Sequence, residues 1–569
     1  MTLENEIELI KGCRAGKDSA RKELYTLYSK QMLAVCFRYT GDMDAAHDVL
    51  HDGFIKIFTN FSFRGESSLC TWITRVMVTQ SLDFLRREKR VSQLVVHEEQ
   101  LPDIPDISDS GGGLSLIHIS NTNQNAAFLR MIARGASIDV DGVYSNPAGL
   151  AFLPKDGLQV ALTIQSAYQT RDIAATSPLW TMDGQTTVRN YEGKASAPVI
   201  PSIHAVYKKG DWAFSGSFAI VGGGGKASFD NGLPMFDAAA ISLVNTIGQG
   251  MLAPNQYSIS SAMEGRQYIY GLQLGASYKI NEHFSVFAGA RMNYFTGGYK
   301  GFLDINLKEG VAEELGREII KQLMAGGMTL EQAQQAALQK SQQLNDAKLK
   351  LDCDQTGWGL TPIIGVDAKF GKLNLAAKYE FKANMNIEND THEIVAPDAA
   401  AAFVAPYQNG VNTPSDLPSM LSVAASYEFL PSLRASVEYH FFDDKNAGMA
   451  DGKQKTLKHG THEYLAGVEW DINKLFTVSG GYQKTDYGLS DAFQSDTSFS
   501  CDSYSVGFGG RINFTQALSL DVAYFWTTYS DYTKEKPRGL EATSMASLVD
   551  KDVYSRTNKV FGVSVNYKF

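Results

Sequence analysis

The sequence predicts a small all-α domain followed by an all-β barrel of about 14 antiparallel strands. Three observations support this fold class. Up to about residue 92, apolar residues recur at the spacing of a helix. From Leu158 onward, segments of roughly ten residues alternate apolar and polar side chains. The connections between these segments are alternately short and long, which is typical of a barrel whose strands run up and down.

The composition agrees with two unlike parts. The chain has 569 residues and a formal net charge of −10, so its overall charge does not indicate nucleic-acid binding. No run of about 18 apolar residues occurs, which argues against a transmembrane helix but not against membrane-spanning strands. The cysteines show no metal-ligand spacing, so we expect isolated thiols, with Cys353 and Cys501 unpaired.

The first domain, residues 1–92, carries several blocks of characteristic residues in a fixed order. They are DAAHDVLHDGF at 44–54, FRGESS at 63–68 and DFLRREKR at 83–90, preceded by Leu24, Tyr25 and Tyr28. This pattern resembles region 2 of the extracytoplasmic-function sigma factors. The resemblance implies that the helix 48–58 docks on the clamp of RNA polymerase core. Its candidate contacts are Asp48, Asp52, Phe54 and Phe58.

The same resemblance implies that the helix 72–90 contacts and melts the minus-ten element of promoter DNA. The candidate DNA-binding residues are Trp72, Arg75, Arg86, Arg87, Lys89 and Arg90. Basic side chains supply phosphate contacts, and aromatic rings support stacking on separated bases. An alternative is that Trp72 and Phe84 are core residues and that the arginines form a solvated helix end. The second sigma domain does not follow Ser110, so we expect this segment alone to start transcription poorly.

We interpret residues 93–120 as a linker or an artificial junction. The stretch after Val91 is polar, acidic and contains proline, and the run LSLIHIS at 114–120 looks like a translated sequencing adapter. No signal peptide is visible at the acidic N-terminus, although an outer-membrane barrel needs one. We therefore interpret the chain as a join of two unrelated genes. A genuine fusion that signals from the membrane is the alternative, but nothing between Arg90 and Asn121 would cross an inner membrane.

The second part, residues 158–569, predicts a transmembrane barrel. One face of each strand is apolar and the other carries charged residues, as with Leu433, Val437 and Phe441 against Arg434, Glu438 and His440. A soluble sandwich also alternates, but short turns at one end and long loops at the other favour a barrel with a polar lumen. The expected strands are 158–168, 199–208, 211–221, 266–280, 283–296, 357–370, 373–386, 418–429, 432–443, 462–472, 475–488, 501–513, 518–530 and 558–569.

Residues 121–157 precede the first strand and contain the triplet Asn146, Pro147 and Ala148. Together with the segment TPIIG at 361–365 and the size of the barrel, this triplet resembles the FadL-like family of long-chain fatty-acid and hydrocarbon transporters. The resemblance implies an outer-membrane channel with an N-terminal hatch, and it makes the triplet the hatch motif. It also implies passive uptake through extracellular loops, a lumen pocket and a movable hatch. The terminal Phe569 corresponds to the signal for the barrel assembly machinery.

In this family a kink of the third strand opens the wall sideways, and the resemblance therefore makes Gly216 the candidate lateral gate. The equal alternative is that Gly216 simply packs against a neighbouring residue. A helical insertion is expected near 307–350 on the extracellular side, where its apolar faces either line the ligand groove or pack as a lid on other loops. No catalytic or metal-binding constellation is visible, so we expect neither an enzyme nor a cofactor. The barrel is expected in the outer membrane with its lipid, and the sigma-like part in the cytoplasm.

Overall fold

The chain divides into two compact units, Met1–Leu101 and Pro102–Phe569. The computed structural model describes residues 3–15, 17–40, 43–59, 63, 69, 72–74, 76–81, 84, 125–177, 180, 187–247, 252–345, 347–397, 404–535 and 551–569. No helix within these ranges is both long and apolar enough to pass through a membrane.

The first unit is all-α. Its helices are α1 (Leu3–Arg14), α2 (Asp18–Thr40) and α3 (Met43–Thr59), and residues 72–74 and 76–81 are also helical. Leu24, Phe54 and Ile73 come from separate helical segments and are each at most 2% exposed, so they form one core. This core explains the apolar spacing that the sequence shows.

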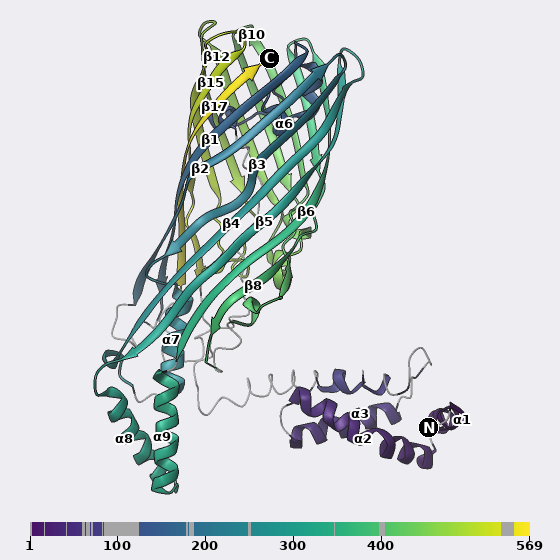
Figure 1. Ribbon diagram of the computed structural model, residues 1–569, viewed down its shortest axis with the longest axis vertical. Helices are drawn as coiled ribbons and strands as arrows, with labels where there is room; N and C mark the ends of the chain where they lie inside the picture. Colours follow the sequence, from purple (N-terminus) through teal and green to yellow (C-terminus); the bar gives the residue numbers. More distant parts are fainter. Residues whose placement is uncertain are drawn as a thin grey trace. The chain divides into compact units, whose positions relative to one another are not determined.

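The second unit is a closed barrel of 14 antiparallel strands (Figure 1), as predicted. The strands are β1 (Gly157–Thr176), β2 (Val188–Lys209), β3 (Trp212–Phe229), β4 (Tyr257–Lys279), β5 (Phe284–Leu307), β6 (Lys348–Phe370), β7 (Leu373–Glu380), β10 (Met420–Leu430), β11 (Leu433–Phe442), β12 (Thr461–Asp471), β13 (Phe476–Asp486), β14 (Ser503–Asn513), β15 (Leu518–Tyr529) and β17 (Lys551–Lys568). Pairing of β1 with β17 closes the ring. Three short strands extend its neighbours: β8 (Asn386–Val395) continues β7, β9 (Asn412–Pro414) lies beside β8, and β16 (Tyr532–Glu535) pairs with β17.

The two faces of the barrel wall differ in polarity. Large apolar side chains such as Leu274, Val437 and Trp470 are 50–61% exposed and point outward. The intervening residues point inward and are mostly polar, because every second residue of a strand faces the same side. An apolar outer band around a polar lumen is the arrangement of outer-membrane barrels.

The tight turns lie where the sequence predicts them. Gly210 and Gly371 adopt φ of +60° and +59°, and each joins two neighbouring strands. At the other end the strands β1 to β6 run further than expected, and the longer connections carry α7 (Pro234–Ile247), α8 (Val311–Ala325) and α9 (Leu330–Asn345) (Figure 1). The helices α8 and α9 lie within the range 307–350, where the sequence predicts a helical insertion.

The apolar faces of these helices are covered. Val311, Leu315 and Ile319 of α8 are at most 8% exposed and share one apolar cluster with α7 and with the nearby ends of the strands. Of the two alternatives for this insertion, the packed lid fits this burial better than an open groove.

Besides single-residue register shifts, two irregularities interrupt the described ladders of the wall over several residues. The ladder between β2 and β3 stops after Ser196–Lys226 and resumes at Ser202–Ala219. The predicted strand 373–386 leaves its partner β6 after Glu380, and β8 pairs with β6 again only from Asn386. Both irregularities lie in the half of the barrel formed by β1 to β8.

Candidate functional site

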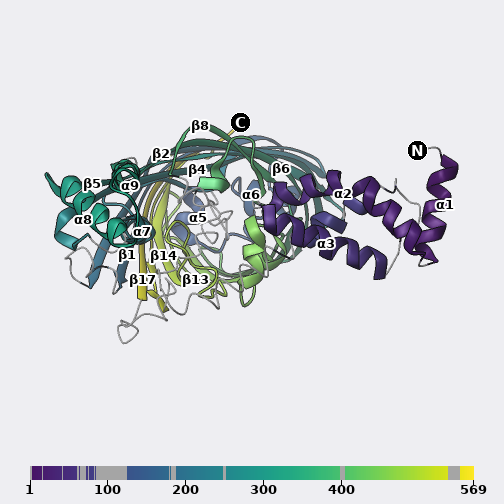
Figure 2. The same cartoon turned by 90° about the horizontal axis from the view of Figure 1, so that it is seen from below.

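The segment that the sequence predicts to be a hatch, described from Asn125 onward and called the hatch below, lies inside the barrel. Its elements α5 (Ala126–Met131), α6 (Gly142–Ser145) and the 3-10 helix η2 (Pro147–Phe152) are almost completely buried, and Figure 2 shows α5 and α6 within the ring of strands. Residues 126–136 are each buried, although this segment has no sheet partner. The hatch therefore depends on side-chain contacts with the wall.

The Asn-Pro-Ala triplet connects the hatch to three consecutive strands. Asn146 Nδ2 donates to Asp367 Oδ2 of β6 at 2.6 Å, and its Oδ1 accepts from the Gly149 amide at 3.2 Å. The Pro147 carbonyl accepts from Ser277 Oγ of β4 at 2.6 Å, and the Ala148 carbonyl accepts from Ser285 Oγ of β5 at 2.7 Å. Each residue of the motif thus participates in docking, and Asn146 also caps η2.

A second attachment is ionic. The Arg130 guanidinium on α5 is 1% exposed and pairs with Glu469 of β12 and with Asp521 of β15, the latter at 2.9 Å. Asp521 also accepts from Arg511, which in turn reaches Asp139 of the hatch at 2.6 Å. Because buried charges are tolerated only when they are paired, this network strongly favours the docked position of α5.

Further polar contacts hold the middle of the hatch. The Gly135 amide donates to Glu438 Oε2 at 2.8 Å, and the other oxygen of Glu438 lies 2.6 Å from His440 Nε2. Two strands away along the ring, Lys378 Nζ of β7 donates to the Tyr144 carbonyl at 2.7 Å. These side chains come from β7 and β11, so the hatch contacts most of the inner circumference.

Glycines in the wall let α5 approach closely. A Cβ atom added at Gly467 or Gly481 would lie 2.1 Å from the Met131 carbonyl oxygen, and one at Gly507 would lie 2.0 Å from the Leu129 carbonyl oxygen. Real Cβ contacts do not occur at such distances, so these positions accept only glycine while α5 is docked. We call these three residues the glycine floor.

The break in the wall lies in a glycine run and not at Gly216. Gly216 pairs regularly with Ala205 and Leu274, so no bend occurs at this position. The pairing of β3 with β4 shifts between Ile220 and Gly225, and Gly223 and Gly225 have φ of +104° and +72°. The break therefore begins six residues after the predicted kink. A lone glycine fits a regular strand, whereas a run of four glycines in which two have positive φ does not.

A cavity of about 100 Å³ lies beside this break. Ala195, Ala197 and Ile200 line it from β2, and Ile220 and Gly222–Gly225 line it from β3. The cavity is bordered by polar Gln165 and Gln169 of β1, whose side chains each leave one buried atom without a hydrogen bond.

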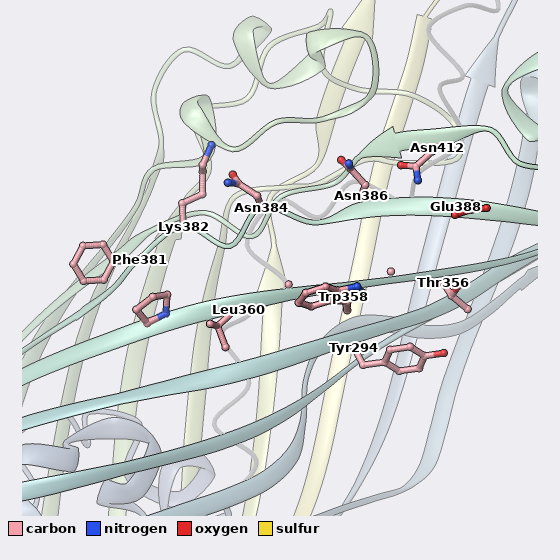
Figure 3. Close-up of a pocket in the computed structure, with 13 residues that line it drawn as sticks. Tyr294, Thr356, Trp358, Leu360, Phe381, Lys382, Asn384, Asn386, Glu388 and Asn412 are labelled. Carbon is pink, nitrogen blue, oxygen red and sulfur yellow. The ribbon is translucent and has the colours of Figure 1, made fainter.

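The second irregularity forms a larger depression, of about 920 Å³, on the outer face (Figure 3). Trp358, which is 67% exposed, and Leu360 line it from β6, while Lys382, Asn384 and Asn386 border it where β7 and β8 separate. A mixed apolar and polar rim of this kind is typical of the membrane interface.

The candidate sigma contacts have unequal positions. Asp52 is exposed on α3 and Phe58 is half-buried, whereas Phe54 is 2% exposed and its ring packs 4.8 Å from that of Tyr25. Phe54 therefore belongs to the core in this conformation and does not present its ring to a partner. Asp48 lies on the same helix, but its side chain is not among those described.

Trp72 and Phe84 both pack against the core of the first unit, and the Trp72 ring lies 5.5 Å from that of Phe63. This packing agrees with the alternative that they are structural residues. The remaining candidates, Arg75, Arg86, Arg87, Lys89 and Arg90, lie outside the described residues.

Comparison with known proteins agrees with the division into two parts. Residues 24–91 match the family model for Sigma-70 region 2. Over 81 residues the chain is 26% identical to the ECF RNA polymerase sigma factor SigW of Bacillus subtilis, a match that covers 14% of this chain and 43% of that protein. It is 28% identical over 86 residues to the RNA polymerase sigma-H factor of Pseudomonas aeruginosa, covering 15% of this chain and 45% of the relative. The chain thus spans under half the length of these relatives.

The barrel has the fold of a FadL homologue. The crystal structure of a Pseudomonas aeruginosa FadL homologue superposes with a TM-score of 0.53 and 15% sequence identity, and it covers 78% of this chain and 98% of that chain. Both resemblances predicted from the sequence are therefore confirmed, one as a family match over a segment and the other as a fold.

Sequence reasoning found the hatch motif but missed its partners. Asp367, Ser277 and Ser285 are inward-facing polar residues of ordinary strands, and they are separated from the triplet by 130 residues or more. Only their position on the polar face signals a contact with something inside the lumen.

Proposed function

We propose that the barrel is an outer-membrane channel for the passive uptake of hydrophobic solutes such as long-chain fatty acids. The solute passes the extracellular loops, reaches a pocket beside the hatch and leaves when the hatch shifts. Folding requires the barrel assembly machinery and outer-membrane lipid. The observation that carries this proposal is a buried segment inside the barrel that polar contacts hold to the wall, next to a break in that wall.

The wall break supports a sideways exit for an apolar solute. The cavity there is lined on one side by alanine and isoleucine, and the backbone between Ser196 and Ser202 has no ladder partner on β3. We therefore move the candidate lateral gate from Gly216 to Gly222–Gly225. The hatch residues Asn146, Pro147 and Ala148 hold the closed state in this proposal.

Uptake of radiolabelled oleate tests the channel. The full chain is placed behind a secretion signal in Gram-negative cells that lack their own fatty-acid channel, and we expect faster uptake than in cells without the chain. Ala197→Trp fills the cavity and should reduce uptake several-fold. Val437→Trp is the matched control, because Val437 is 59% exposed on the outer face. Uptake equal to that of empty cells at normal surface levels would contradict the proposal.

We further propose that residues 24–91 bind RNA polymerase core and minus-ten promoter DNA. The family match supports this second function, and exposed Asp52 on α3 offers a contact for the polymerase. Because the chain spans under half of its sigma relatives, we expect core binding without efficient promoter-specific transcription.

Co-purification of residues 1–92 with core polymerase tests this second function. The segment has its own apolar core, so it is a reasonable unit to express. Asp52→Lys should weaken binding, whereas Glu23→Lys makes the same charge change on exposed α2 and should not. Promoter-specific run-off transcripts from the segment alone would contradict the expected loss of initiation.

A further inference from the structure

Two arginines face each other on the inner wall of the barrel. Arg171 of β1 and Arg556 of β17 are direct partners in the antiparallel register that closes the ring. Both belong to the inward-facing set of their strands, in which Thr163 and Ser564 lie opposite each other and are buried beneath the hatch. Arg171 is only 8% exposed.

This pair is not neutralised by the described part of the chain. Neither guanidinium forms an ion pair with a carboxylate of the described residues, and the Nε atom of each is buried without a hydrogen bond. The Arg556 guanidinium lies 4.9 Å from the centre of the Tyr529 ring, which stabilises a cation without supplying a counter-charge. Like charges directly opposite each other in a sheet destabilise it, and a buried charge without a partner adds a further cost.

The surroundings of the pair are also incomplete. The next inward-facing pair along the two strands is Gln169 and Asn558, and each of these side chains has a buried oxygen without a hydrogen-bond donor. Gln169 and Asn558 line the cavity beside the wall break, together with apolar Ala167 and Val560. The cationic pair therefore lies one inward-facing position beyond the residues that line a partly apolar cavity.

The glycine run brings the wall break next to the arginines. A Cβ atom at Gly224 would lie 2.7 Å from Arg171 Nη2, so a side chain there would displace the guanidinium. Gly222–Gly225 thus serve two purposes, because they interrupt the ladder and leave room for Arg171.

We propose that Arg171 and Arg556 form an anion-binding subsite that holds the carboxylate of an amphipathic ligand, with its apolar tail in the adjoining cavity. Guanidinium groups match the two oxygens of a carboxylate through paired N–H donors, and a bound carboxylate would supply the missing counter-charge. The inference rests on the proposed channel function for the source of the ligand. The arginine pair would make this part of the wall bind acids more tightly than neutral molecules of the same chain length.

Calorimetric binding to the full chain in an uncharged detergent tests the subsite. The probes are octanoate and octan-1-ol, each corrected for its partition into empty micelles. We expect octanoate to bind at least tenfold more tightly than octan-1-ol. Inorganic phosphate, which has no tail, should not displace octanoate at equal concentration; displacement would overturn the part of the proposal that assigns the tail to the cavity.

Variants separate the subsite from general charge effects. Arg171→Gln/Arg556→Gln should abolish the preference for octanoate and leave octan-1-ol binding unchanged. Arg266→Gln/Lys300→Gln removes the same charge from exposed side chains and should retain the preference. Because the first double variant also relieves repulsion, its unfolding temperature should not fall, whereas a purely structural role for the arginines would lower it.

Two results would overturn the proposal: equal binding of acid and alcohol by the unaltered chain, or an unchanged preference in Arg171→Gln/Arg556→Gln. Failure of the channel function gives a different pattern. In that case oleate uptake would be absent from cells while the preference for octanoate in detergent persists.

Discussion

Replacing Asn146 with alanine should release the hatch from β6. The substitution removes the hydrogen bond from Asn146 Nδ2 to Asp367 at 2.6 Å and the cap on the Gly149 amide at 3.2 Å. A hydrogen bond to a carboxylate contributes about 2 kcal/mol and a helix cap about 1 kcal/mol. The loss is therefore about 3 kcal/mol, which raises the fraction of undocked η2 roughly a hundredfold.

Hydrogen exchange of the refolded chain, followed by mass spectrometry, measures this fraction. Amides in 146–153 should exchange about a hundredfold faster in Asn146→Ala, in proportion to the undocked population. Asn281→Ala is a matched control, since Asn281 caps an exposed turn through its contacts with the His283 and Phe284 amides and does not touch the hatch.

Asn146→Asp separates the two contacts. An aspartate still accepts from the Gly149 amide, but its second oxygen faces the Asp367 carboxylate, and like charges at this distance repel. We therefore expect faster exchange in Asn146→Asp than in Asn146→Ala. If exchange in 146–153 stays unchanged in Asn146→Ala, or if the aspartate variant is the milder one, the triplet does not anchor the hatch as the contacts indicate.

Two further predictions concern the glycine floor and the first unit. Gly481→Val should displace α5, because the new Cβ would lie 2.1 Å from the Met131 carbonyl oxygen, and the conductance of the barrel across planar bilayers should therefore rise. Gly480→Val is the control: the nearest contact of its Cβ would be 3.7 Å away, so the conductance should stay low. Equal conductance in both variants would show that the floor does not seat α5. Burial raises the pKa of the Cys13 and Cys36 thiols, so iodoacetamide should modify both slowly at neutral pH in the folded unit and quickly after denaturation, as measured by mass spectrometry of each site. Rapid modification of the folded unit would contradict this packing.

The sequence predicts the membrane part of the barrel well because each strand there has one face in lipid and one in the lumen. Alternation is then strict, as in β11, and all 14 expected strands are present. In the outer half of β4, the run YSISSAMEG at 257–265, Tyr257 and Met263 are buried in the apolar cluster of α7 and α8. The residues between them are mostly small and polar on both faces, so the alternation is weaker there. Cys353 and Cys501 are both free thiols, in agreement with the expectation from the sequence.

The candidate site is less accessible to sequence reasoning. The triplet at 146–148 is a local motif, but the acceptors and donors that dock it lie on distant strands, and only the folded ring brings them together. Gly216 failed as the kink because one glycine does not reveal its backbone conformation. Phe54, a predicted polymerase contact, is buried in the core of the first unit. Helical spacing places an apolar residue on one face of a helix but does not say whether the residue's own domain covers that face.

The glycine floor has a mechanical consequence for the plugged barrel. Where α5 meets Gly467, Gly481 and Gly507, the carbonyl groups of Leu129 and Met131 face glycine backbone that carries no side chain. Resistance to displacement of α5 therefore comes from the ion pairs of Arg130 and from the apolar packing of Phe128 and Leu129 on the wall, and not from these three glycines. Once those contacts are broken, the three glycines present no side chain that would have to change rotamer for α5 to move along this part of the wall.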